Sequence, residues 1–289
     1  MAIDVLAEIL TNRALSADYN VVGFHAPDLA RLAQPGQFVM VKTSRRDDPL
    51  LRRPFSIFEI LRDAQGQPIG VSVLNKRVGV GTALLYEAAV GDALPILGPL
   101  GQSWTGAAHA VSSQEQASPT GVTTDTPREH WMVAGGVGLA PFVTLAETLS
   151  ASHQPMRLFY GGRSASDLYY ASLFEELGAA LVLTTEDGTR GEKGRVTAPL
   201  ERALSDRGQM PVTLYACGPT PMMRAVADLG KHYGAVTFVS LEPIMGCGMG
   251  GCYSCVVKVN DHDHPHFVRS CIEGPIFDAS RIMWDALVH

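Results

Sequence analysis

The chain has 289 residues, and its 23 Lys and Arg against 29 Asp and Glu give a formal net charge of −6. Hydrophobic residues make up 46% of the chain and charged residues 18%, a composition that excludes a disordered protein and predicts a folded core shared by two or three domains. The acidic balance, with no long cluster of Lys or Arg, argues against a general nucleic-acid-binding protein.

The N-terminal segment does not read as an export signal. Residues 1–8 include Asp4 and Glu8, where a signal peptide has a basic segment and then an apolar run. The most apolar uncharged stretch, residues 131–146, contains three glycines and a proline and is too short to span a bilayer. We therefore expect a cytoplasmic protein that does not enter membranes. Its thiols would stay reduced, which favours metal binding or catalysis over disulfides for the five cysteines.

The first hundred residues are predicted to be mainly β-structure. Short β-type runs at residues 38–42, 55–60 and 69–74 are bounded by turn-forming residues, and residues 83–88 predict one short helix. Strands at this spacing are typical of a small antiparallel barrel. Residues 105–128 follow, without an apolar period, and are interpreted as a flexible insertion.

From about residue 130 the pattern alternates between strand and helix. The strand-like runs are residues 131–134, 157–160, 180–184 and 212–216. The helix-like segments are residues 142–150, 171–177 and 221–229. Such alternation predicts a parallel sheet with helices on its faces. The last 50 residues differ again, because they are rich in Cys and Gly and carry a β-type run at 255–259.

Two glycine-containing turns follow strands of the predicted sheet. Residues 135–141, Gly-Gly-Val-Gly-Leu-Ala-Pro, lie between a strand and a helix, where free N–H groups favour a pyrophosphate and Pro141 suits the first helical turn. An ordinary tight turn explains this segment equally well, since the spacing is not G-x-G-x-x-G. Residues 216–221 form a second turn at the same edge, so the two predict one crevice; Cys217 there is alternatively a small buried residue.

Two segments of the predicted barrel combine positive charge with small or rigid residues. Arg52 and Arg53 precede Pro-Phe-Ser, and a guanidinium group matches phosphate bidentately. Residues 75–82 supply two glycines and a hydroxyl before the short helix and predict a second phosphate cradle. Surface charge on a barrel remains the simpler interpretation of Arg52 or Arg77 alone.

Four of the five cysteines lie close to the C-terminus. Cys247, Cys252 and Cys255 follow the spacing C-x4-C-x2-C, with Cys271 further on, which is the plant-type pattern for a [2Fe–2S] cluster. A four-cysteine zinc site is the competitor, although zinc ligands usually come as two C-x2–4-C pairs. The Asp- and His-rich residues 261–266 are interpreted as a solvated hairpin tip rather than a metal site.

The order of these segments resembles the electron-transfer subunits of two-subunit, NAD-linked dihydroorotate dehydrogenases, a family within the ferredoxin–NADP reductase superfamily. The resemblance covers nearly the whole chain and is specific in combination. The segments that carry it are residues 35–39, 51–57, 79–82, 97–101, 135–141, 185–194, 217–219 and 245–252.

The resemblance implies a β-barrel plus α/β fold: an antiparallel flavin-binding barrel, a parallel-sheet nucleotide-binding domain and a small C-terminal iron-sulfur domain. The expected boundaries are 1–104 for the FAD-binding barrel, 105–128 for the insertion, 129–237 for the NAD-binding domain and 238–289 for the cluster domain. Arg53 is expected on the FAD phosphates and Ser56 near the flavin ring. The other expected contacts are Pro54 and Phe55 for FAD, Gly79, Gly81 and Thr82 for its phosphates, Gly136 and Gly138 for NAD, Cys217, Gly218 and Pro219 for the wall near the nicotinamide, and Cys247, Cys252, Cys255 and Cys271 for the cluster.

The function implied is an oxidoreductase subunit without catalytic residues for dihydroorotate of its own. Electrons would pass from the FMN of a catalytic dihydroorotate dehydrogenase subunit through the [2Fe–2S] cluster and FAD to NAD+, in a heterotetramer that serves pyrimidine biosynthesis. A related NAD(P)H-linked subunit serving ferredoxin or sulfide/polysulfide is the alternative, and a non-catalytic zinc-stabilised binding module is a remote one. The sequence leaves NAD against NADP open, because residues 161–164 also suit a 2′-phosphate.

Overall fold

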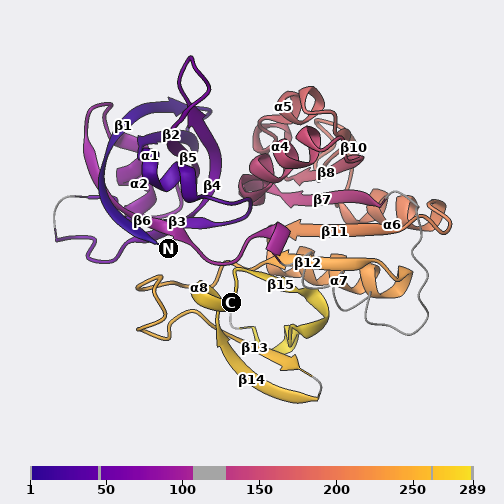
Figure 1. Ribbon diagram of the computed structural model, residues 1–289. Coiled ribbons are helices and arrows are strands. Elements are labelled where there is room, and N and C mark those ends of the chain that lie inside the picture. Colours follow the sequence, from indigo (N-terminus) through magenta and orange to yellow (C-terminus); the bar gives the residue numbers. More distant parts are fainter. Residues whose placement is uncertain (1, 45–46, 107–127, 262, 288–289) are drawn as a thin grey trace.

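The computed structural model describes residues 2–44, 47–106, 128–261 and 263–287 and consists of three parts (Figure 1). A β-barrel is followed by a sheet covered with helices and then by a smaller segment that carries a hairpin. Most of the predicted insertion at 105–128 lies outside the described residues. In the described part of the chain, no helix is long and apolar enough to cross a membrane.

The barrel is closed and antiparallel, with the strand order β1-β2-β5-β4-β3-β6. Its elements are β1 (Ile3–Ala14), β2 (Tyr19–His25), α1 (Pro27–Leu32), β3 (Phe38–Val41), β4 (Arg53–Arg62), β5 (Pro68–Lys76), α2 (Val80–Glu87) and β6 (Ala93–Leu100). The predicted barrel is thus confirmed, and the predicted strands are β3, β4 and β5. The predicted helix is α2, which begins three residues earlier than expected. Alternating side chains of these strands fill the interior, among them Ile9, Val39 and Val73.

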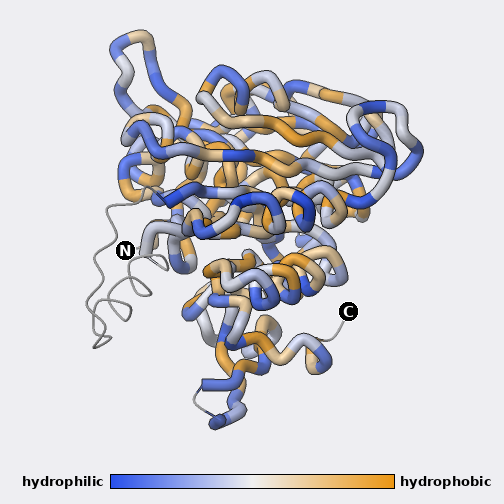
Figure 2. Tube along the Cα trace, turned by 90° about the vertical axis from the view of Figure 1, so that its right-hand side faces the viewer, coloured by the Kyte–Doolittle hydropathy of each residue, from blue (hydrophilic) through white to orange (hydrophobic). Residues whose placement is uncertain are grey.

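The second part is a seven-stranded sheet with the order β10-β9-β8-β7-β11-β12-β15. Its strands are β7 (Glu129–Gly135), β8 (Met156–Gly162), β9 (Ala180–Thr185), β10 (Glu192–Lys193), β11 (Val212–Cys217), β12 (Val236–Ser240) and β15 (Ile276–Asp278). All neighbours are parallel except β15, which pairs antiparallel with β12. The predicted parallel sheet is therefore confirmed. Figure 2 shows apolar residues along the strands and polar residues in the peripheral loops.

Two apolar cores lie on the two faces of this sheet. One contains side chains of α4 (Val143–Ala151) and α5 (Ala171–Glu176), and the other those of α6 (Thr197–Asp206) and α7 (Thr220–Tyr233). The first core also includes barrel residues such as Tyr19 and Phe58. A continuous apolar core thus packs the barrel against the sheet and fixes the position of one part relative to the other.

The third part is built around a hairpin of β13 (Val256–Asp261) and β14 (His264–Arg269), followed by α8 (Ser270–Glu273) and β15. The predicted hairpin is present, but its tip is shorter than residues 261–266, because β14 begins at His264, which pairs with Asp261. The segment between β12 and β13 forms a loop that carries three of the clustered cysteines. Because β15 returns to β12, this part completes the edge of the sheet.

Candidate functional site

The two glycine turns meet at the carboxyl ends of β7 and β11. A Cβ atom at Gly138 would lie 2.3 Å from the carbonyl oxygen of Cys217, and one at Gly218 would lie 3.0 Å from the backbone of Gly135. Side chains at these positions would force the turns apart, so glycine is needed for their contact. The predicted crevice between the turns is therefore present. One detail of the prediction is wrong: residues Gly136–Phe142 form a 3-10 helix, so Pro141 lies inside it and α4 begins later, at Val143.

A cleft of about 690 Å³ opens over these turns. Its wall includes Gly135, Gly136, Gly218 and Pro219 from the turns, and Arg163, Glu186 and Arg195 from the neighbouring loops. Exposed backbone N–H groups and two guanidinium groups make this cleft suited to an anionic dinucleotide. Arg163 is not fully free to move, because its Nε lies 3.6 Å from Asp167 Oδ2.

The Arg-Pro-Phe-Ser segment opens β4 and lines a second cavity of about 290 Å³. Pro54, Phe55 and Ser56 contribute to its wall, as predicted for a flat ring system beside an aromatic segment. The adjacent arginines are placed differently. Arg52 donates two hydrogen bonds to the carboxylate of Asp4, at 3.0 and 2.8 Å, so both terminal nitrogens of its guanidinium group already have a partner. Arg53 instead donates from Nη1 to the carbonyl of Leu51, and within the described residues it forms no ion pair with a carboxylate.

The second predicted cradle lies next to Arg53. A Cβ atom at Gly81 would approach Arg53 Nε to 3.0 Å and Thr43 Oγ1 to 3.2 Å, and the Thr43 hydroxyl is buried without a hydrogen-bond partner. The Arg53 guanidinium group, the buried Thr43 hydroxyl and the Gly81 backbone thus lie together, and a guanidinium group beside a glycine backbone suits a phosphate. This geometry suits the FAD phosphates that the resemblance implies.

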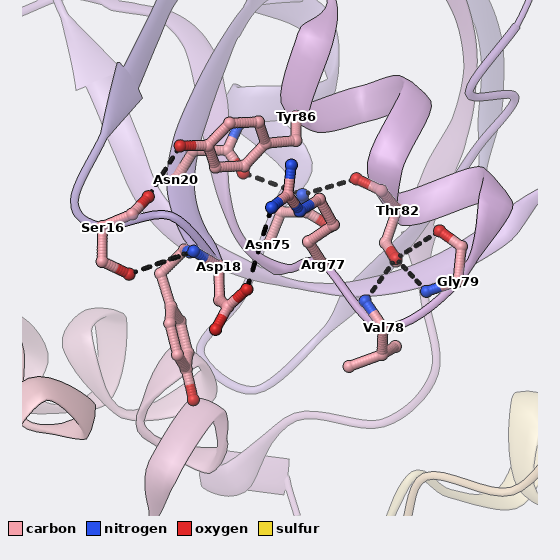
Figure 3. Close-up of polar contacts among 10 residues, drawn as sticks. Ser16, Asp18, Asn20, Asn75, Arg77, Val78, Gly79, Thr82 and Tyr86 are labelled. Carbon is pink, nitrogen blue, oxygen red and sulfur yellow. Dashed lines mark hydrogen bonds and ion pairs between the residues drawn. The ribbon is translucent and has the colours of Figure 1, made fainter. Parts of the chain in front are cut away.

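The loop before α2 is held by Thr82 (Figure 3). The Thr82 hydroxyl oxygen accepts hydrogen bonds from the N–H groups of Val78 at 2.9 Å and Gly79 at 3.0 Å. The Asn75 amide donates to the Thr82 carbonyl at 2.9 Å, which ties the start of the helix to β5. Thr82 therefore shapes the cradle from within, and its hydroxyl is already engaged in the loop itself.

The four clustered cysteines lie on one loop and on the short elements beside it. Cys247, Cys252 and Cys255 are on the loop, and Cys271 is in α8; of these, Cys255, which directly precedes β13, and Cys271 are buried. Cys255 and Cys271 pack with Met245 against barrel residues of β3 and β6. Within the described residues no three His, Cys, Asp or Glu side chains are already arranged around a metal-sized space. The ligand assignment therefore rests on the spacing and on the donors around the sulfurs.

Hydrogen-bond donors point at these sulfur atoms. The Met249 N–H group donates to Cys247 Sγ at 3.3 Å, and Ser254 Oγ lies 3.2 Å from Cys252 Sγ. The hydrogen bonds from Ser254 lower the pKa of Cys252 to about 6, whereas burial beside Cys255 raises the pKa of Cys271 to about 12. N–H groups directed at thiolates are what an iron–sulfur cluster needs from its loop, so the donor set fits a [2Fe–2S] centre.

Sequence reasoning missed Glu242 as a site residue. Its carboxylate belongs to the walls of both the cleft and the flavin-sized cavity, and Cys217 Sγ lies 3.9 Å from Glu242 Oε1. Neighbouring residues crowd the Glu242 carboxyl group, yet the residue is exposed through the two cavities, so water reaches it until a ligand fills them. This enclosure raises the pKa of Glu242. The pKa of Cys217 is raised as well, mainly by burial and to a smaller extent by the nearby carboxylate of Glu242. Only the position of this acidic residue, two residues after the end of β12, hints at this role in the sequence.

We expect FAD affinity to fall as pH rises through the pKa of Glu242. A flavin ring in the cavity would remove water from the carboxyl group and raise its pKa further, so binding takes up a proton and is favoured on the acid side. Titrating FAD into the apoprotein at several pH values, by quenching of flavin fluorescence, measures this slope. Glu242→Gln should bind FAD with a flatter pH profile, and an unchanged slope would contradict the expectation.

The described chain matches two family models. Residues 132–228 match the oxidoreductase NAD-binding domain, and residues 242–283 match the iron-sulfur cluster binding domain of dihydroorotate dehydrogenase B. The boundaries fall on the sheet with its glycine turns and on the cysteine segment. The two matches therefore cover the cleft and the candidate cluster site.

Relatives and solved structures agree with these matches. The "dihydroorotate dehydrogenase B (NAD(+)), electron transfer subunit" of Desulforamulus reducens is 34% identical over 281 residues, which is 96% of this chain and 98% of the relative. That of Bacillus caldolyticus is 34% identical over 252 residues, or 87% and 88% of the two chains. A chain from the structure of the NADH-dependent reduced ferredoxin-NADP oxidoreductase superposes with a TM-score of 0.78 at 26% identity, covering 98% of this chain and 91% of that one.

Proposed function

The chain belongs to the family of electron-transfer subunits of NAD(+)-dependent dihydroorotate dehydrogenase B, and from this we propose how its sites work together. It is a flavin and iron–sulfur oxidoreductase subunit that passes electrons through a [2Fe–2S] cluster and FAD to NAD+ in the oxidation of dihydroorotate to orotate. When bound, the flavin supplies hydride chemistry and the cluster supplies one-electron transfer. The protein's own residues bind and orient these groups.

One observation carries the proposal: the three candidate sites are contiguous. The cavity beside Arg53 shares the wall residues Lys76, Val137 and Glu242 with the dinucleotide cleft. On its other side, Met245 belongs both to that cavity and to the apolar cluster that holds Cys255 and Cys271 against the barrel. A cluster, a flavin and a nicotinamide bound at these places would follow one another in a line, as a chain of electron carriers requires.

We assign the residues as follows. Arg53 and the backbone around Gly81 hold the FAD phosphates, Thr82 shapes their loop, and Pro54, Phe55 and Ser56 line the ring cavity. The Gly136 and Gly138 turn receives the dinucleotide, with Cys217, Gly218 and Pro219 forming the wall near the nicotinamide. Cys247, Cys252, Cys255 and Cys271 hold the cluster. The proposed divisions are residues 1–104 for FAD, 129–237 for NAD and 238–289 for the cluster, with 105–128 as the insertion.

The catalytic partner is proposed to carry FMN and to form a heterotetramer with this chain. Exposed apolar side chains surround the cysteine loop, among them Ile244, Met249, Tyr253 and Ile272. Apolar surface of this kind is expected where a partner subunit docks, and docking there would bring the partner's flavin close to the cluster. A cytoplasmic location belongs to the same proposal, because cluster assembly needs reduced thiols.

The absorbance spectrum and metal content of anaerobically purified protein test the cofactors. We expect flavin bands, the long-wavelength absorption of the cluster, and two irons per chain by the stoichiometry of a [2Fe–2S] centre. Zinc without iron and without flavin would instead support the zinc-stabilised module. Steady-state reduction should favour NADH over NADPH, as the names of the NAD(+)-linked relatives suggest; an NADPH preference would contradict this assignment.

A ferredoxin-linked reductase is the second candidate, and the superposition on the reduced ferredoxin-NADP oxidoreductase chain favours it. The two functions differ in the partner. Reconstitution with a catalytic dihydroorotate dehydrogenase subunit should give dihydroorotate-dependent reduction of NAD+. If reduced ferredoxin alone supported this reduction and the catalytic subunit did not, the second function would hold.

A further inference from the structure

A hydrogen bond joins the barrel to the nucleotide sheet at the edge of the cleft. The hydroxyl of Tyr19, the first residue of β2, donates to Asp167 Oδ1 at 3.1 Å. Asp167 ends the short 3-10 helix that follows β8, and the two residues are 3% and 7% exposed. A buried bond between a neutral hydroxyl and a carboxylate is directional and is costly to break, because the acceptor would be left unpaired.

The same carboxylate also holds the loop that forms the cleft wall. Its Oδ2 accepts the backbone N–H of Arg163 at 3.1 Å, and the main-chain carbonyl of Asp167 accepts the hydroxyl of Tyr160 at 2.9 Å. Asp167 thus connects the barrel, through Tyr19, with β8 of the sheet, which it contacts at Tyr160 within the strand and at Arg163 just after its end. A shift of the barrel at this point would be transmitted to the backbone of Arg163.

Tyr19 itself faces the cleft. It lines the cleft together with Lys76 and Gly136, and its hydroxyl would lie 3.8 Å from a Cβ atom at Gly136. The Lys76 ammonium group stands 4.9 Å from the centre of its ring. Tyr19 is therefore a barrel residue in contact range of the turn that is proposed to receive the dinucleotide.

Ring contacts also cross this boundary. Tyr19 packs on Tyr169 with ring centres 4.9 Å apart, and Phe58 meets Tyr170 edge-on at 4.7 Å. Apolar contacts of this kind are not directional and tolerate small sliding movements. On the opposite side of the glycine turn, Trp104 Nε1 donates to the carbonyl of Pro141 at 3.0 Å. A further hydrogen bond, from the Arg13 guanidinium group to the Tyr170 hydroxyl, is exposed to solvent, so the buried directional restraint on the cleft side is the Tyr19–Asp167 bond.

We propose that Tyr19 and Asp167 are positioning residues for hydride transfer, because their bond sets the barrel, with its flavin site, against the cleft, with its nicotinamide site. This inference rests on the proposed exchange between NADH and FAD. In that step a hydride, two electrons and one proton, leaves the nicotinamide, NADH becomes NAD+, and the flavin is reduced. The reacting atoms must approach to about 3–3.5 Å, and a misplacement of about 1 Å costs on the order of a hundredfold in rate.

The test uses the FAD- and cluster-loaded protein with Tyr19→Phe, Asp167→Asn and the double variant. Tyr19→Phe removes one oxygen and keeps the ring packing. We expect the rate constant for flavin reduction at saturating NADH, measured by stopped flow, to fall about tenfold, with little change in the NADH concentration that gives half-saturation. The double variant should be no slower than the slower single variant, since both remove one bond.

A second readout does not depend on activity. Hydrogen–deuterium exchange should rise at the backbone N–H groups of residues 163–170 in Tyr19→Phe. Tyr215→Phe is the matched control, because it also removes a buried tyrosine hydroxyl, one that lies 3.0 Å from His130 Nδ1 inside the sheet. We expect neither flavin reduction nor exchange at 163–170 to change in this control.

Two results would overturn the inference. One is an unchanged rate of flavin reduction in Tyr19→Phe despite faster exchange, which would make the contact purely structural. The other is a change in half-saturation alone, which would make Tyr19 a binding contact. If the unaltered protein is not reduced by NADH at all, the proposed function itself fails, and that result is separate from both.

Discussion

Cys255→Ser is expected to abolish the iron–sulfur cluster while leaving FAD bound. Cys255 is 2% exposed and packs with Cys271 in the apolar cluster between the cysteine loop and the barrel. Loss of this ligand leaves three, too few to hold a [2Fe–2S] centre stably. Iron content should fall to near zero, and dihydroorotate-dependent reduction of NAD+ with the partner subunit should fall with it. Reduction of an artificial acceptor by NADH should persist, because the flavin cavity and the cleft are not formed by this residue.

The fifth cysteine provides the control for this variant. Cys217 is also buried, but it lies at the end of β11 beside Glu242 and belongs to a different apolar core from Cys255. Cys217→Ser should therefore keep its full iron content. Equal iron loss in both variants would indicate general misfolding, and retained iron in Cys255→Ser would refute the ligand assignment.

Arg53→Ala is expected to weaken FAD binding about 10- to 150-fold. This corresponds to about 1.5–3 kcal/mol for the loss of charge-assisted hydrogen bonds to a phosphate. The guanidinium group lies beside the Gly81 backbone, at the turn proposed to hold the FAD phosphates. The dissociation constant, measured by FAD titration of the apoprotein, gives the effect directly.

Arg52→Ala is the matched control, one residue away. The Arg52 side chain is 23% exposed and is already paired with Asp4, an interaction that contributes little to stability at a surface. FAD affinity should therefore change little in this variant. If Arg52→Ala weakened FAD as much as Arg53→Ala, the phosphate contact could not be assigned to Arg53.

The sequence predicted those parts of the fold that local patterns determine. Alternating apolar runs indicated the parallel sheet, and turn-bounded strands indicated the barrel, because burial on one or two faces leaves a period in the sequence. The long strand β1 (Ile3–Ala14) was not recognised. It carries Glu8 and Arg13 among its apolar residues, and its pairing with β2 and β6 depends on contacts far along the chain.

The candidate site was predictable where one segment supplies all its parts. The cysteine spacing and the glycine turns are local, and the structure places both turns in contact. Tyr19 and Glu242 were missed, because each acts across a distance in sequence: Tyr19 meets a residue 148 positions away, and Glu242 lies between two cavities. Neither residue spacing nor composition predicts contacts between residues that only the folded chain brings together.

The antiparallel strand β15 has a consequence for how this protein could be shortened. It pairs with β12 through Phe238, Val239 and Ser240 and covers the outer edge of the parallel sheet. Cutting the chain after β12 would expose that edge, with its unpaired backbone groups, to other molecules and invite self-association. The iron–sulfur segment is thus no detachable module: a smaller, iron-free reductase made from this chain would have to retain β15 or replace it.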